Sequence, residues 1–317
     1  MSDRTVDLKG LVPAVVLPLD EKYQIDEAEL RRYIMWLVSH EGLAGVAVNA
    51  DTGEGPHLSP AERIRVLEVW VEEVAGRIPV VAGIGGPSTA AEVDGATAAK
   101  ATGADAVLVF PIPAYLGTPR DPELPYRYHA SVQEAAGLPM VLFQLQPALG
   151  GVLFSEDVLL KLFSLEMAVA IKEASFDAVE FIRMANLIRK HAPHITLLTG
   201  NDNFIYESFI LGAEGALIGF GTLAVAEQIA MIRAAQARDW DTGHELNTRV
   251  VAPLSEAVFA APVRDYRVRT KHALQMMGVL ERTHVRPPLL PLSPPELETL
   301  REAMLATDQI GGAAGRS

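Results

Sequence analysis

The apolar run Met167-Ala-Val-Ala-Ile171 ends at Lys172 and continues as Glu-Ala-Ser175. Short runs rich in alanine and β-branched residues are typical of strands buried on both faces of a parallel sheet. Seven further runs of this kind lie at Leu11–Leu19, Leu43–Asn49, Ile78–Gly83, Ala106–Pro111, Pro139–Leu145, Ile195–Gly200 and Gly215–Gly219. The longer stretches between them have helical periodicity, so the sequence predicts eight strand-then-helix units.

The helix signals between these runs are clear at several places. Ser59–Gly76 begins with an N-cap serine and a proline at the first helical position, and Ser88–Gly103 and Asn201–Gly212 also end at glycine. Eight units within about 235 residues match a (β/α)₈ barrel, whose usual length is roughly 250 residues. A doubly wound sheet is the alternative, but no GxGxxG turn follows the first run.

The alternation of strands and helices stops in the last quarter of the chain. Three helical segments without strands are expected at Asp239–Phe259, Asp265–Met277 and Ser293–Ala306. We therefore expect residues 1–235 to form the catalytic barrel, residues 236–308 a three-helix extension, and residues 309–317 a disordered tail.

Composition excludes several classes of function. Acidic residues outnumber basic ones by 40 to 27, and the formal net charge of −13 disfavours nucleic acid and anionic membranes as partners. The absence of cysteine excludes disulfides and thiolate chemistry. No segment reads as a signal peptide or a transmembrane span, so a cytoplasmic location is expected. No His-x-His or HExxH spacing occurs, and no metal is predicted.

Lys172 is the strongest single clue to chemistry. Active sites of (β/α)₈ barrels lie at the carboxyl ends of the strands, and Lys172 ends an apolar strand there. Burial lowers the pKa of a lysine, and a neutral amine can attack a carbonyl to form a Schiff base. The alternative is a structural lysine paired with Glu173 or another inward acid.

Four features together resemble the dihydrodipicolinate synthase / N-acetylneuraminate lyase family. They are the strand ending in IKEAS at 171–175, TGE at 52–54, GND at 200–202, and the three-helix extension. The resemblance covers roughly residues 8–305. It implies a (β/α)₈ class I aldolase or lyase that needs no cofactor, is usually a homotetramer, and binds pyruvate or another 2-oxo acid as an imine on the lysine matching Lys172.

The loop after the second strand departs from the family pattern at one position. Thr52 and Gly53 match the threonine and glycine that bind the substrate carboxylate, whereas Asp51 replaces the preceding threonine. Asp51 is a candidate general acid or base. Its alternative interpretation is a turn carboxylate that faces solvent.

The larger departure follows the fifth strand. The family's catalytic tyrosine aligns with Phe143, which cannot transfer a proton, and the substrate-binding arginine of many synthases falls near the uncharged Leu149. Both differences argue against the synthase of lysine biosynthesis. Tyr115 is a candidate replacement hydroxyl or a rim aromatic at a subunit contact. The neutral Gln144 and Gln146 predict a distal pocket for a neutral or less acidic substrate.

The resemblance also assigns the glycines to the pocket. Gly200 and Gly219 are predicted to contact substrate together with Phe143 and Gln144. Asn201 and Asp202 stand where a helix should begin, so capping is their expected role and ligand contact is the secondary one.

The sequence thus predicts an enzyme in which Lys172 forms an imine with a 2-oxo acid, Thr52 orients the carboxylate, and Asp51, Tyr115 or water moves protons. One alternative is a sugar-acid (2-keto-3-deoxy type) dehydratase with the same imine mechanism. Another is a catalytically impaired homologue that binds a 2-oxo or sugar acid. The expected partners are a small-molecule substrate and further copies of the chain, as a tetramer or dimer.

Overall fold

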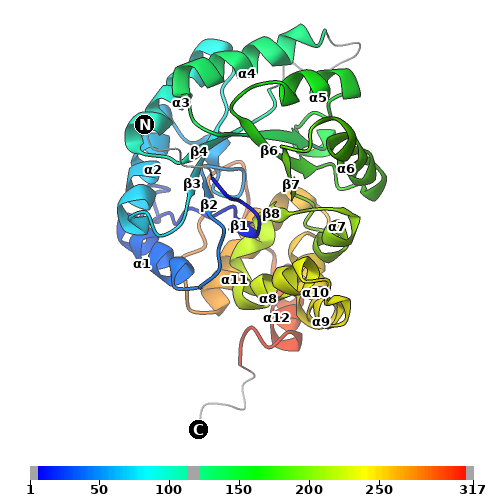
Figure 1. Ribbon diagram of the computed structural model, residues 1–317. Coiled ribbons are helices and arrows are strands. Elements are labelled where there is room, and N and C mark those ends of the chain that lie inside the picture. The colour runs from blue at the N-terminus through cyan, green and yellow to red at the C-terminus, as the bar shows by residue number, and fades with distance from the viewer. Residues whose placement is uncertain (1–5, 113–120, 312–317) are drawn as a thin grey trace.

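All eight predicted strands form one parallel sheet that curls into a barrel surrounded by helices (Figure 1). This computed structural model describes residues 6–112 and 121–311. The order is β1-β8-β7-β6-β5-β4-β3-β2, and parallel bridges from Leu11 to Leu43 and from Ala14 to Ala47 join β1 to the β2 side of the barrel. The strands are β1 (Leu11–Pro13), β2 (Val46–Val48), β3 (Val80–Ile84), β4 (Ala106–Val109), β5 (Met140–Leu145), β6 (Ala168–Ala174), β7 (Thr196–Thr199) and β8 (Gly215–Ile218). The predicted (β/α)₈ fold is confirmed.

A helix follows each strand. They are α1 (Glu27–Val38), α2 (Pro60–Val74), α3 (Thr89–Thr102), α4 (Glu123–Ala136), α5 (Glu156–Phe163), α6 (Ala178–His191), α7 (Ile205–Leu211) and α8 (Val225–Gln236). Ser59 is the N-cap of α2, as its sequence predicts, and it forms a reciprocal capping box with Glu62. The helix α7 begins four residues after the expected Asn201, because that side chain and Asp202 bond elsewhere.

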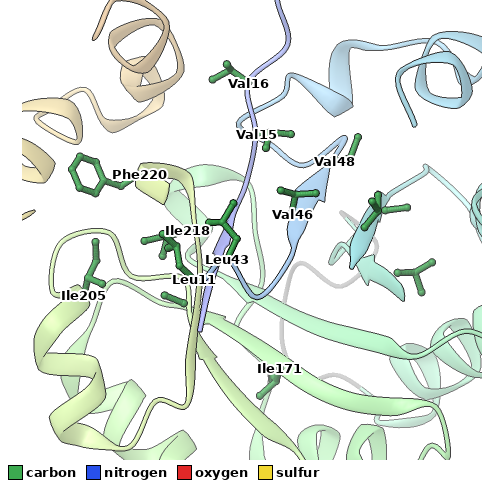
Figure 2. Packing of buried hydrophobic residues seen from close by; sticks show 14 of the residues in the cluster. Leu11, Val15, Val16, Leu43, Val46, Val48, Ile171, Ile205, Ile218 and Phe220 are labelled. Carbon is green, nitrogen blue, oxygen red and sulfur yellow. The ribbon is translucent and has the colours of Figure 1, made fainter. Parts of the chain in front are cut away.

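The strands separate two hydrophobic layers because successive side chains point to opposite faces. Bulky residues face the helices, and Figure 2 shows members of this outer layer from β1, β2, β6 and β8, including Leu11, Val46, Ile171 and Ile218. The barrel interior is filled by alternate residues of the same strands, such as Val12, Ala47, Val81, Phe143, Ala170 and Leu217. A polar side chain on an inward-facing position therefore lies in apolar surroundings.

The extension consists of α9 (Trp240–Leu246), α10 (Ala252–Val258), α11 (Tyr266–Met276) and α12 (Pro294–Ala306). The single helix expected over 239–259 contains a π-helical segment, η5 (Asn247–Val251), between α9 and α10. In Figure 1, α9, α10 and α12 gather beside α8. Of the expected tail, Gln309 and Ile310 contact the chain before them, and residues 312–317 lie outside the described part.

The helix α11 is joined to the barrel by a buried ion pair. Lys271 donates to Glu54, at the end of the loop after β2, with 2.6 Å between Lys271 Nζ and Glu54 Oε1. Both side chains are fully buried. Lys271 also donates to the carbonyl of His284, and the other Glu54 oxygen accepts the Arg286 amide at 2.8 Å. Both charges are thus paired and hydrogen-bonded, as burial demands.

In the ranges 6–112 and 121–311, no helix has the length and apolarity needed to cross a membrane.

Lys271→Met should lower the free energy of unfolding by about 3–5 kcal/mol, because it leaves the Glu54 carboxylate buried without its counter-charge. Chemical denaturation of wild type and variant measures this difference. Lys9→Ala breaks the exposed pair with Glu214 and should cost less than about 1 kcal/mol. Equal small effects of both changes would contradict the structural importance of the buried pair.

Candidate active site

Lys172 lies on the inward face of β6, near the carboxyl end of the strand. It is flanked by Ala170 and Ala174 of the interior layer and pairs with Phe143 of β5 and Leu198 of β7. Its exposed fraction is 9%, so the amine is nearly removed from solvent. The structure therefore places Lys172 where the sequence predicts, at the end of the barrel where active sites of this fold are found.

The amine of Lys172 has aromatic rather than ionic contact. Its Nζ lies 4.5 Å from the ring centroid of Phe143, which meets Phe110 edge to face. Among the residues that the structure describes, Lys172 makes no salt bridge. Burial lowers the pKa of Lys172 to about 8, and the carboxylates of Asp202 and Asp51 act in the opposite direction. The neutral amine is therefore a minor form near neutral pH, but a far larger fraction than for an exposed lysine.

Glu173 does not pair with Lys172, so this form of the structural-lysine interpretation is wrong. The Glu173 side chain points to the helix side of β6, where it accepts from Asn201 at 2.6 Å and Gln144 at 3.1 Å. The lysine with a structural role is Lys271, which lies within the expected helical segment Asp265–Met277.

Gln144 is separated from the candidate site by the alternation of β5. Phe143 faces the barrel interior, so Gln144 faces outward, where it contacts Glu173 and accepts from the Phe154 amide. The structure does not bring Gln144 together with Lys172, and a role in substrate binding does not fit this position.

Asp51 and Thr52 meet a tyrosine from the extension. The hydroxyl of Tyr266 donates to Asp51 Oδ2 at 3.0 Å and lies 3.1 Å from Thr52 Oγ1. Arg267 binds the Asp51 carboxylate and donates from Nε to the Asp51 carbonyl at 2.8 Å. Asp51 is thus half-buried and held by side chains of α11, which contradicts the interpretation as a solvent-facing turn residue.

The loop that holds Asp51 and Thr52 is tightly constrained. Asn49 and Glu54, at its two ends, have φ values of 59° and 55° in the left-handed region. For residues other than glycine this costs on the order of 1 kcal/mol or more each and needs support from surrounding contacts. At Gly53, a Cβ atom would lie 2.8 Å from the carbonyl oxygen of Val15. Gly53 is therefore required for close packing of the loop.

Asp202 is a further candidate, for which the sequence favours capping over ligand contact. It does not cap α7; its Oδ1 accepts the amide of Phe220 at 2.8 Å. Burial raises the pKa of Asp202 to about 7, while the Phe220 hydrogen bond and the charge of Lys172 lower it. Asp202 and Lys172 therefore influence each other within one buried cluster. The sequence signal was GND at 200–202, which is part of the family resemblance but which gives Asp202 no role beyond a helix start by itself.

Gly200 and Gly219 are next to the reactive side chains. A Cβ on Gly200 would lie 2.6 Å from Lys172 Cε, and one on Gly219 would lie 2.8 Å from the Tyr266 ring and 3.2 Å from Thr52 Oγ1. Both glycines leave the space that these side chains occupy. Tyr115, the other candidate hydroxyl, lies outside the described residues.

A cavity of about 520 Å³ opens beside Asp51 and extends to Phe110, Leu145 and Leu149. Arg63 and Arg267 also line it. The loop after β5 is uncharged, as the sequence indicates, and charged side chains reach the cavity from other elements. The expectation of a neutral or less acidic substrate stays a prediction.

A buried lysine at the catalytic end of a (β/α)₈ barrel, with no salt bridge among the described residues, is typical of class I aldolase-like enzymes. The match to the Dihydrodipicolinate synthetase family model spans residues 7–307, and the chain belongs to that family. The expectation of a homo-oligomer stays a prediction.

Two similar proteins are 4-hydroxy-tetrahydrodipicolinate synthases. That of Nitrobacter hamburgensis is 31% identical over 299 residues, covering 94% of this chain and 96% of its own length. That of Rhodopseudomonas palustris is 31% identical over 307 residues, covering 95% and 97%.

Solved structures of dihydrodipicolinate synthases are similar to this chain over nearly its whole length. That of Bacillus anthracis superposes with a TM-score of 0.84 at 29% identity, covering 95% of this chain and 98% of the other. That of Acinetobacter baumannii, complexed with pyruvate, has a TM-score of 0.84 at 28% identity and covers 96% and 100%.

Asp202→Asn should lower the pKa of Lys172 below about 8, because it removes a carboxylate that favours the ammonium. The midpoint of the pH dependence of Lys172 carbamylation by cyanate should shift to lower pH by on the order of one unit. Peptide mass spectrometry measures the modification. Asp241→Asn on α9 is the matched control and should leave the midpoint in place. A midpoint that stays constant or rises in Asp202→Asn would refute the coupling.

Proposed function

We propose that the protein forms an imine between Lys172 and the carbonyl carbon of pyruvate or another 2-oxo acid. The carrying observation is the Lys172 amine itself, which is 9% exposed, has a pKa lowered to about 8, and faces the barrel interior. Such an amine is nucleophilic near neutral pH. The resulting protonated imine accepts the electron pair released when a neighbouring bond to carbon is broken or formed.

The other residues of the cluster have distinct roles in this proposal. Thr52 and the loop amides around Gly53 orient the substrate carboxylate. Gly200 and Gly219 leave the space that the Lys172 side chain and the Tyr266 ring need to reach the site. Asp202 adjusts the charge of the amine. Phe143 contributes an apolar wall under the amine and no proton.

The second reactant is proposed to differ from that of the lysine-pathway synthases after which the relatives are named. The family resemblance assigns a carboxylate-binding arginine near position 149 and a tyrosine at position 143, and this chain has Leu149 and Phe143 there. Asp51 and Arg267 instead place an ion pair beside the cavity. A substrate with hydroxyl groups that match this pair fits the cavity, which keeps the sugar-acid dehydratase as the nearest alternative reaction.

Borohydride reduction in the presence of a panel of 2-oxo acids should add the mass of the reduced ligand to the protein. Peptide mapping should place the adduct on Lys172, because reduction makes the imine permanent. Lys172→Arg should give no adduct, whereas Lys100→Arg, on the outer helix α3, should react like wild type. If pyruvate and every other acid of the panel leave wild-type Lys172 unmodified, the proposal fails. That result would favour the alternative of a catalytically impaired homologue that binds a 2-oxo or sugar acid.

Product analysis should then separate the reactions. An aldolase releases two carbonyl fragments from one substrate, whereas a dehydratase releases water and keeps the carbon chain intact. We expect little turnover of pyruvate with aspartate semialdehyde, because Leu149 offers no charge to its carboxylate. Mass spectrometry of the reaction mixtures measures each product. Rapid condensation with the semialdehyde would contradict the proposed difference from the lysine-pathway synthases.

A further inference from the structure

The extension supplies a phenol to the candidate site that the barrel strands lack. Tyr266 is the first residue of α11, and its buried ring stacks on Phe259 with 4.7 Å between centroids. Its hydroxyl reaches Thr52 and Asp51, in the loop after β2. Gly219, after β8, allows this approach because any larger residue would occupy the position of the ring.

We infer that the Tyr266 hydroxyl transfers protons during imine formation on Lys172, in the role left open by Phe143. This inference rests on the proposed function. It assigns a catalytic residue to the extension and makes Asp51 its proton partner.

The hydrogen bonds form a short chain with a defined direction. The single Tyr266 proton points to Asp51 Oδ2, so the Tyr266 oxygen accepts from the Thr52 hydroxyl. Arg267 fixes the Asp51 carboxylate in its place. A chain of this kind can reverse the direction of its hydrogen bonds when a proton enters at one end and leaves at the other.

The Lys172 amine and this hydrogen-bonded chain have the same two carboxylates as electrostatic neighbours. Asp51 and Asp202 both act on the charge of Lys172, and the same two carboxylates act on Tyr266. Burial, and then Asp51, raise the pKa of Tyr266 well above its ordinary range. The hydroxyl therefore stays protonated near neutral pH and gives up its proton only when another replaces it.

The proton balance of imine formation fits such a chain. The Lys172 ammonium first loses a proton, and its nitrogen lone pair forms a bond to the carbonyl carbon while the C=O π pair moves to oxygen. One proton then passes from nitrogen to that oxygen, and the resulting hydroxyl leaves as water when it receives the proton that the ammonium lost. An ammonium and a carbonyl thus give a protonated imine and one water, and Tyr266, Thr52 and Asp51 end in their starting protonation states.

The alternative is a purely structural tyrosine that ties α11 to the loop after β2. A structural role would affect stability and substrate affinity, whereas proton transfer affects the rate of imine formation at saturating substrate. These readouts separate the two roles.

Tyr266→Phe should slow the borohydride-trapped appearance of the Lys172 adduct by about 100-fold or more at saturating 2-oxo acid, which is the usual contribution of a positioned general acid or base. The 2-oxo acid concentration that gives half the maximal rate should change only a few-fold, because the aromatic ring remains. Tyr206→Phe is the matched control, since it also removes one hydroxyl that is bonded within the fold, to the Trp240 carbonyl at 2.8 Å. It should react at the wild-type rate.

A rescue experiment tests whether a phenol at a second position can replace that of Tyr266. Phe143→Tyr restores a phenol beside Lys172, and in the Tyr266→Phe background it should recover a large part of the lost rate. A rate within three-fold of wild type in folded Tyr266→Phe overturns the inference, as does a slow variant that Phe143→Tyr fails to rescue.

A further variant covers the case in which Tyr266→Phe does not fold. Asp51→Asn keeps the shape of the partner and removes its proton affinity, so a wild-type rate in that variant overturns the inference. Absence of any adduct in the wild-type protein is a different result, because it overturns the proposed function itself.

Discussion

The buried ion pair between Glu54 and Lys271 is the constraint on which the candidate site depends. Asp51 and Thr52 stand just before Glu54 in the chain, and Tyr266 stands five residues before Lys271 on α11. The pair therefore fixes the loop after β2 and the first turn of α11 relative to each other. Neither charge could remain buried alone, so the barrel and the extension must dock in this one arrangement. The hydrogen bonds of Tyr266 to the loop then form without further loss of conformational freedom.

The two buried lysines show how burial separates structural from chemical roles. Lys271 has a carboxylate and a carbonyl as partners, whereas Lys172 has an aromatic ring and carboxylates that influence it without a salt bridge among the described residues. Burial lowers the pKa of both amines, and the direct hydrogen bond and charge of Glu54 oppose this effect only at Lys271. The distinction depends on partners brought from other elements, which is why position in a helix or a strand alone does not decide it.

The fold and the central amine could be predicted because their signals are local. Apolar runs such as Met167–Ile171 and caps such as Ser59 depend on neighbouring residues, and Lys172 interrupts such a run. The orientation of Gln144 was also accessible, since Phe143 and Gln144 alternate on one strand. Tyr266 had no comparable signal, because its role depends on how α11 docks onto a loop more than 200 residues earlier in the chain. For Asp202 the sequence favoured capping over ligand contact, because an acidic residue near a helix start usually caps it.

The stack of Tyr266 on Phe259 and its fit against Gly219 have a consequence for how this fold can diversify. When proton-handling groups are supplied by an appended helix rather than by a barrel strand, the strands are free to keep their packing while the appendage changes. A new reaction can then arise when the appended segment is exchanged, while the buried Lys172 amine stays in place. Such an exchange requires a small residue after β8, since Gly219 decides whether a ring from the extension can reach the loop after β2.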